Sequence, residues 1–332
     1  MKTSHLNFRL SLLALFCGLL GVIACNKSAS EDPGLAKVAE VNAATAQAGK
    51  IHNSGLDYIA GTVFKLTTPG ESFAKAIRTK GSSMSRAATL TTTTADIAAA
   101  AAAYVAKDPA YAGIKLANPD EAVRSLDELN AKFYDTGLQG QWTKSYSDNK
   151  LKSLATSREY AMVADIEATF NDLYKQNLTY DQFYTSFKSK VEDLKKKYAG
   201  IKYAENEGEL FNGILSIGAN SNEYWYEAFR EADLILGGGD IILQPGNGEV
   251  ISPCAFVQAD CIGYLSGWAS ALWDDYNSPG GVKPSGQTRR IGQGVIWGLS
   301  ASSFGLIRMK VAPKVVVTPI LLPEPDKVVP VN

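Results

Sequence analysis

The stretch that decides the fold is IGQGVIWGLSASSFGLI, which runs over Ile291–Ile307 and contains no charged side chain. It is bounded by Arg290 on one side and by Arg308 on the other. As a helix these 17 residues would be about 25 Å long. Gly294 and Gly298 would then lie about one turn apart, on a surface of small residues that lets another helix approach closely. We therefore predict an apolar helix that pairs closely with a second one.

A second segment of small and apolar residues, Phe256–Trp273, is the expected partner because Gly263 and Gly267 repeat the same spacing. Such a pair is either a central hairpin buried by amphipathic helices or a membrane-inserting hairpin over residues 256–307, as in bacteriocin-like or pore-forming proteins. Seventeen residues fall short of the roughly 20 that span a bilayer, and Gln293 dilutes the hydrophobicity. Burial is therefore the favoured arrangement.

The middle third of the chain predicts three successive amphipathic helices. Asn118-Pro119-Asp120-Glu121 supplies the cap, the first-turn proline and the acids of a helix N-terminus. Thr179 and Gln182 form a capping box for the third helix, which ends at Gly200. Helices of this kind hide their apolar faces against one another. The sequence thus predicts a mostly α protein, a helical bundle around the glycine-rich apolar pair. The three faces comprise Val123, Leu126, Leu129 and Phe133; Leu154, Ile166, Phe170 and Leu173; and Phe183, Phe187, Val191, Leu194 and Tyr198.

Further segments complete a helical domain that we place at residues 35–310, with a sub-boundary near 81–94. Thr94 is predicted to cap a helix over 95–106, and two more helices are predicted over 210–217 and 223–232. The glycine-rich segment 234–253 predicts a short irregular or hairpin insert. Residues 311–332 contain five prolines among valines, which predicts an extended C-terminal tail.

The N-terminus has the pattern of a removable signal peptide over residues 1–24. Lys2 and Arg9 precede Leu10–Ile23, an apolar run of 14 residues that is too short to span a bilayer as a helix. Residues 25–34 are small, polar and acidic, and include Pro33. This composition predicts a flexible tether between the cleavage site and the helical domain.

The cleavage site Val22-Ile23-Ala24-Cys25 resembles the lipobox of bacterial lipoproteins. Ser30-Glu31-Asp32 is similar to the short acidic export tag of surface lipoproteins from the Bacteroidota, and the block His52–Tyr58 resembles a segment near the start of lipoproteins from that phylum. Asn26 in place of Asp follows the cysteine, which does not match the enterobacterial signal for inner-membrane retention.

The resemblance covers about the first 60 residues. It implies that Cys25 carries a lipid anchor such as palmitate, that the protein is held at the outer membrane, and that it is displayed on the cell surface; it implies no activity. The alternative is an ordinary signal peptide that ends near a cysteine.

Composition excludes several classes of protein. Cleavage after residue 24 would remove Lys2 and Arg9 from 33 basic residues and none of the 34 acidic ones, so nothing in the charge balance favours nucleic acid. His5 would also leave, so His52 would be the one remaining histidine. Zinc sites built from four cysteines or from two cysteines and two histidines are therefore excluded, as are HExxH metalloproteases, and we expect neither a metal nor a cofactor.

Cys254 and Cys261 would be the two thiols left beside the anchor. On one continuous helix their Cα atoms would lie about 10 Å apart, which is too far for a disulfide. If a helix begins after Cys254, a bridge outside the cytoplasm becomes feasible. A disulfide and two buried thiols therefore both remain open.

His52 lacks the sequence context of a catalytic base. Asp57, five residues on, does not share its helical face, and no GxSxG nucleophile motif occurs in the chain. A structural or surface role is therefore predicted for His52. Gly237-Gly238-Gly239-Asp240 is interpreted as a turn, because neither a GK[ST] motif nor a helix start follows it.

Trp225, Trp273, Asp274 and Asp275 are the candidate ligand-platform residues, because aromatic faces beside carboxylates suit sugar binding. Aromatic residues near helix ends are more often core residues, which is the competing interpretation.

The function predicted from the sequence is that of a lipid-anchored, non-catalytic interaction or structural module of the cell envelope. Its partners would be the membrane and an envelope protein or a glycan. Two alternatives stay open: a membrane-active protein that uses the hairpin over 256–307, and a carboxylate-dependent hydrolase or glycan binder.

Overall fold

The computed structural model describes residues 33–65, 67, 72, 92–116, 118–130, 155–176, 178–204, 207–236, 243–244, 253–279, 281, 286–308 and 310–311. The predicted signal peptide, Cys25, the turn at 237–240, most of the predicted tether and sub-boundary, and the tail beyond residue 311 lie outside these residues. Where the chain is described it is mostly helical, which confirms the predicted fold class.

The elements follow one another in a simple order. They are α2 (Pro33–Thr62), α4 (Thr94–Val105), the 3-10 turn η3 (Pro109–Tyr111), α5 (Pro119–Asn130), α8 (Ser157–Lys175), α9 (Tyr180–Lys197), α10 (Glu209–Leu236), β1 (Leu243–Gln244), α11 (Pro253–Asn277), α12 (Gln287–Arg308) and β2 (Lys310–Val311).

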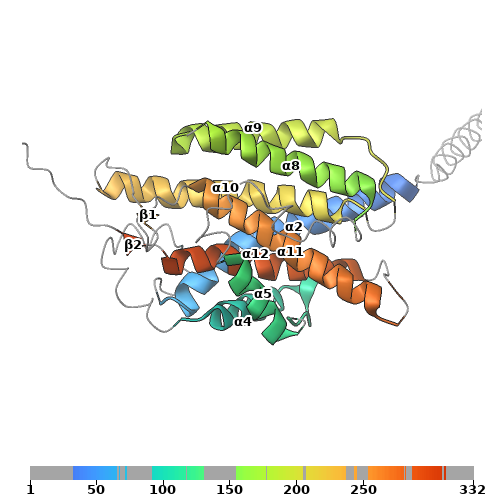
Figure 1. The fold of residues 1–332 in the computed structure, drawn as a ribbon, viewed down its shortest axis with the longest axis horizontal. Helices are drawn as coiled ribbons and strands as arrows, with labels where there is room; N and C mark the ends of the chain where they lie inside the picture. The colour runs from blue at the N-terminus through green and yellow to red at the C-terminus, as the bar shows by residue number, and fades with distance from the viewer. Residues whose placement is uncertain are drawn as a thin grey trace, which may run out of the picture.

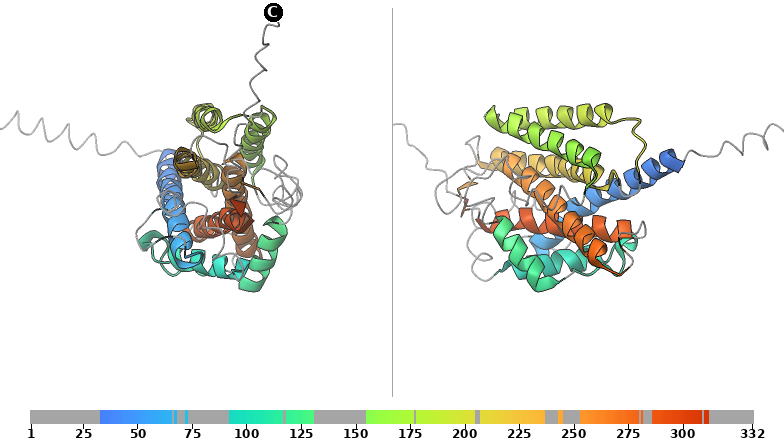
Figure 2. Two further views of the ribbon diagram at one scale, coloured as in Figure 1. Left: turned by 90° about the vertical axis from the view of Figure 1, so that its left-hand side faces the viewer. Right: turned by 45° about the vertical axis from the view of Figure 1, so that its right-hand side comes forward.

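The helices are layered around α12. In Figure 1, α8 and α9 lie side by side over α10, and α4 and α5 cover the opposite side of the α11–α12 pair. In the end-on view of Figure 2 (left), α12 lies in the middle of the bundle, and α2, α4, α10 and α11 contact it from different sides. The two glycine-rich segments are thus the centre of the fold.

Helices α11 and α12 contact each other through their backbones. A Cβ atom added to Gly263 would lie 2.7 Å from the Cα atom of Gly298, and one added to Gly267 would lie 2.4 Å from the carbonyl oxygen of Gln293. No side chain larger than hydrogen fits at either position without movement of the helices. The close approach predicted from the glycine spacing is confirmed.

Helix α12 is enclosed along nearly its whole length. Every residue from 290 to 303 is buried, Phe304 is half-buried and Gly305 is buried. The predicted burial of the Ile291–Ile307 stretch is therefore confirmed as far as residue 305. None of the helices in the described ranges is both long enough and apolar enough to cross a membrane.

The predicted helix starts are close to those observed. The Thr179–Gln182 capping box is present at α9, as predicted. At α4 the capping residue is Thr93 and not Thr94: the Thr93 hydroxyl accepts the backbone N–H of Asp96, and the Asp96 carboxylate accepts the N–H of Thr93. The prediction was one residue late because neighbouring threonines are equally good caps and only the position of Asp96 distinguishes them.

Two helices are longer than the sequence indicated. The helices predicted over 210–217 and 223–232 are one continuous helix, α10, in which the intervening Ser221 and Asn222 are buried. Helix α2 begins at Pro33 and so includes Pro33 and Gly34, which were assigned to the tether. Within this helix a Cβ on Gly55 would lie 2.7 Å from the Leu299 side chain, so this glycine provides room for α12.

The short strand β1 lies within the predicted irregular or hairpin insert. It pairs antiparallel with β2, which follows α12, so that Leu243 faces Val311 and Gln244 faces Lys310. The pairing therefore joins the two ends of the α11–α12 hairpin.

The close contact at Gly267 predicts that replacing this glycine by alanine destabilises the protein, which is the opposite of the usual effect in a helix. Gly→Ala inside a helix ordinarily stabilises a protein by about 0.5–1 kcal/mol. Gly267→Ala should instead lower the free energy of unfolding by about 1–3 kcal/mol, because the added methyl group forces α11 and α12 apart. Urea denaturation followed by circular dichroism measures this. Gly61→Ala, whose Cβ would meet Thr67 and no other described residue, is the control and should cost less; equal effects at both sites would contradict the close packing.

Candidate functional site

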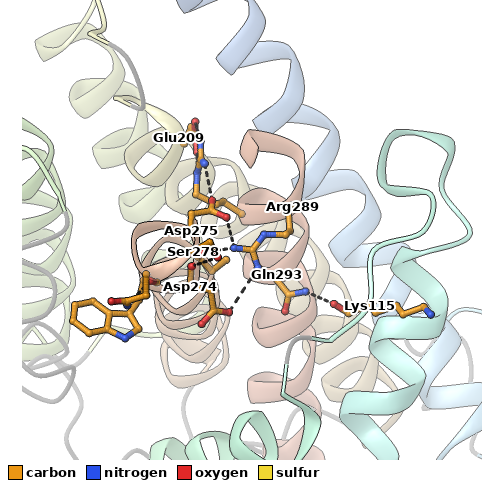
Figure 3. A network of polar contacts seen from close by, with 11 residues as sticks. Lys115, Glu209, Asp274, Asp275, Ser278, Arg289 and Gln293 are labelled. Atoms are coloured by element: carbon orange, nitrogen blue, oxygen red, sulfur yellow. Dashed lines mark hydrogen bonds and ion pairs between the residues drawn. The ribbon is translucent and has the colours of Figure 1, made fainter. Parts of the chain in front are cut away.

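One group of buried ionisable side chains lies where α10 begins, α11 ends and α12 begins. Glu209 is the first residue of α10, Asp275 lies in the last turn of α11, and Arg289 and Arg290 lie in the first turn of α12. Three stretches that are distant in sequence thus meet in the polar network drawn in Figure 3.

Arg290 is fully buried and is held by two carboxylates. Its Nη2 donates to Oε1 of Glu209 at 2.7 Å and its Nε donates to Oε2 at 2.8 Å, so this pair is bidentate. Its Nη1 donates to Oδ2 of Asp275 at 3.0 Å. Trp268 adds an indole N–H to Oε2 of Glu209 at 3.2 Å. Burial works against the charged form of Arg290, but the two carboxylates raise its pKa above the ordinary value, so the buried cation is compensated.

Arg289 continues the network toward the surface. Its Nη2 donates to Oδ1 of Asp275 at 2.5 Å, and its Nη1 lies 3.7 Å from Oδ2 of Asp274. Burial raises the pKa of Asp274, and Arg289 opposes this shift. One turn further, the Gln293 amide donates to the backbone oxygen of Lys115 at 2.6 Å (Figure 3), which ties α12 to the segment before α5.

The predicted ligand platform is not one surface. Trp225 lies on α10 with no exposed area, and Asp275 is bonded to Arg289 and Arg290. Trp273 is 39% exposed, and its ring stacks on that of Tyr276 with 6.2 Å between centroids. The platform prediction is therefore wrong for Trp225, which belongs to the core. The competing interpretation, that this aromatic residue belongs to the core, is correct, although Trp225 lies in the middle of α10 and not near a helix end.

A second buried network joins α2, α10 and α11 around the carboxylate of Asp260. Its Oδ1 lies 2.9 Å from Nε2 of His52, and its Oδ2 accepts the Ser221 hydroxyl at 2.6 Å and the Trp225 indole N–H at 3.0 Å. The side chains of His52 and Asp260 are both fully buried.

This second network has a structural geometry. The carboxylate of Asp260 lies between the Ser221 hydroxyl and the imidazole of His52, whereas a catalytic serine is bonded directly to its histidine. His52 is therefore a structural residue, one of the two roles predicted. Its partner is Asp260 and not Asp57, which accepts the Tyr224 hydroxyl at 2.8 Å.

Cys254 and Cys261 are free thiols, and both are buried in the continuous helix α11. Because α11 begins at Pro253, before Cys254, the geometry that would have allowed a disulfide is absent from this helix. Of the two alternatives, the disulfide is therefore wrong, and both cysteines are buried thiols. Burial raises the pKa of Cys254 to about 12, which makes a reactive thiolate unfavourable.

Glu159 is a further buried acid. It belongs to α8 and caps the N-terminus of a different helix, α10. It lies in the first turn of α8, and its carboxylate accepts the backbone N–H of Gly208 at 2.6 Å and that of Phe211 at 2.8 Å, at the N-terminus of α10. Burial raises its pKa to about 7; the two N–H groups oppose the shift, and the nearby Glu209 and Glu207 add to it. The α8–α9 layer is thereby fixed to the core.

The sequence alone does not indicate these pairs, although two of the residues involved are unusual in their surroundings. Asp260 lies inside the apolar segment 256–273, and Arg290 borders the uncharged stretch, so both needed a buried partner. The partner of Arg290 lies 81 residues away in the chain, and no local pattern points to it.

Comparison of the chain with protein-family models, with curated proteins and with solved structures found no match. Within the ranges that the structure describes, no group of three or more His, Cys, Asp and Glu side chains could hold a metal ion.

The Arg290 network predicts a large effect of breaking one pair and a smaller effect of replacing both partners. Arg290→Met should lower the free energy of unfolding by about 3–5 kcal/mol, because Glu209 keeps a buried charge without its partner. The double variant with Glu209→Leu should recover much of that loss. Chemical denaturation of the two single variants and the double variant gives the coupling energy.

The matched control is Lys195→Ala, which removes the exposed ion pair with Glu192 and should cost less than about 1 kcal/mol. An Arg290→Met variant as stable as Lys195→Ala would contradict the role assigned to the buried pair.

Glu159 predicts a pH dependence of stability with a defined sign. Its pKa is about 7 in the folded protein and 4.5 without burial, so the folded state binds more protons between these values. Glu159 therefore contributes its full share to the free energy of unfolding below pH 4.5. This share, about 3 kcal/mol, is lost as the pH rises through 7. The stability difference between wild type and Glu159→Gln should shrink by that amount over this pH range. Glu227→Gln, at an exposed position of α10, should follow wild type; a Glu159→Gln curve parallel to wild type would refute the assignment.

Proposed function

We propose that this protein is a lipid-anchored outer-membrane protein whose helical body is displayed on the cell surface as a non-catalytic interaction or structural module. The anchor would be Cys25, after cleavage of the Val22-Ile23-Ala24-Cys25 site. Two or more acyl chains on one residue bury enough methylene groups to hold a protein on a bilayer. The body would bind an envelope protein or a glycan.

The short distance between the anchor and the fold supports this proposal. Helix α2 begins at Pro33, so seven residues separate Cys25 from the helical body. Seven extended residues reach about 25 Å at most. The end of the bundle where α2 begins would therefore stay close to the lipid headgroups.

The use of the reactive side chains supports a non-catalytic role, and this is the observation on which that part of the proposal rests. His52 and Asp260 hold α2 against α11, and Glu209 and Arg290 hold α10 against α12. Each of these four side chains is fully buried and engaged in a pair. Groups arranged in this way stabilise one packing of the helices, whereas a carboxylate-dependent hydrolase needs acids that face a substrate.

The anchor is tested by replacing the acylated cysteine. Cys25→Ala should abolish incorporation of labelled palmitate and release the protein from the membrane fraction, because no thiol remains at the cleavage site. Cys17→Ala, which changes a cysteine of the predicted leader, is the matched control and should keep both properties. Persistent membrane association of Cys25→Ala would overturn the lipid anchor, and resistance of the wild-type protein to proteinase K on intact cells would overturn surface display.

A further inference from the structure

A groove opens between α2, α10 and the segment that follows α9. Its volume is about 610 Å³, within the 300–1,000 Å³ typical of sites for small molecules. It is lined by one face of α2 around Asn42 and Lys50, by one face of α10 from Phe211 to Asn220, and by residues 198–201 with Tyr203. None of the residues that line the groove was singled out by the sequence as a binding residue.

The floor of the groove is apolar. Phe211, Leu215 and Tyr203 form its base, each at most 9% exposed, and the half-buried Tyr198 and Ile201 supply apolar surface that a ligand can reach. The ring of Tyr198 packs edge-on against Phe211, with 5.0 Å between centroids and planes at 77°. A flat ring or a short acyl group would find a preformed surface here.

The walls carry amide side chains that are held in place. The Asn212 amide donates to the Tyr203 hydroxyl at 2.6 Å and to the Gly208 carbonyl at 2.9 Å. The Asn220 amide donates to the Ser216 carbonyl at 2.8 Å. These fixed polar groups border the apolar floor, which is the combination that orients a ligand in a pocket.

The charged residues that line the groove are basic. Lys50 and Lys195 line it, and none of the described lining residues is acidic. Lys195 contacts Glu192 at 2.8 Å, but both side chains of this pair are about half exposed. Exposed pairs of this kind contribute little free energy, so Lys195 can exchange its partner for a ligand at small cost.

We propose that this groove binds a small amphipathic anion: an aromatic or short acyl body that rests on the half-buried Tyr198 and Ile201, with a carboxylate, sulfonate or phosphate group placed between Lys50 and Lys195. The polar edge of such a ligand meets the amides of Asn212 and Asn220. The proposal concerns a free small molecule and does not depend on the lipid anchor.

The groove is tested with 1-anilinonaphthalene-8-sulfonate, a fluorescent ring compound with one sulfonate, on the folded chain from residue 26 onward. It should bind saturably with one molecule per chain. Ala46→Trp, which fills the groove from an exposed position on α2, should abolish binding. Ala43→Trp, equally exposed on the same helix but outside the groove, is the matched control and should bind like wild type. Unchanged binding in Ala46→Trp, or equal loss in both variants, would overturn the site.

The charge assignment has its own test. The double variant Lys50→Met and Lys195→Met should raise the dissociation constant of the dye about five- to tenfold, because two favourable charges are lost while the methylene stems stay. Lys190→Met, an exposed residue of α9 outside the groove, should leave it unchanged. The neutral dye Nile red should bind the double variant and wild type alike. Sulfonate binding that does not respond to the double variant would overturn the preference for an anion.

Discussion

The contact between the backbones of α11 and α12 is the constraint on which the rest of the structure depends. Gly263 and Gly267 allow the two helices to approach until backbone atoms of one helix meet the other at these positions. The remaining faces of both helices carry further apolar side chains that need to be covered. Helices α2, α4 and α10 cover these faces, so that α12 becomes the buried axis of the bundle.

Enclosure of α12 also explains the buried charges. The first turn of α12 packs against the start of α10 and the end of α11, and Arg290 lies on the buried side of that turn. Glu209 and Asp275 compensate that charge, just as His52, Ser221 and Trp225 serve Asp260 on α11. Such pairs contribute less to net stability than an apolar core of the same volume would. We infer that they select one alignment of α2 and α10 on the central pair, because any other alignment leaves a charge buried without its partner.

The sequence predicts the architecture better than the site. Residue spacing along one segment was enough for the helical bundle, for the Gly-rich pair and for the α9 capping box, because those features depend on neighbours three or four residues apart. The single helix α10 was divided in two because the small and polar residues 218–222 resemble a loop. In the structure Ser221 donates a hydrogen bond to Asp260 inside the protein, and the helix continues. The Arg290–Glu209 pair and the role of Trp225 depend on partners far away in the chain, and periodicity carries no information about those.

Hydrogen–deuterium exchange measured by mass spectrometry is the most direct test of this buried axis. If the α11–α12 pair is the enclosed core, peptides covering residues 259–272 and 290–303 should be the last to exchange, and only through global unfolding. Peptides from the outer helix α9 should exchange earlier. Exchange of the 290–303 region as fast as that of α9 would show that α12 is not the centre of the fold, and that the glycine contact does not organise the bundle.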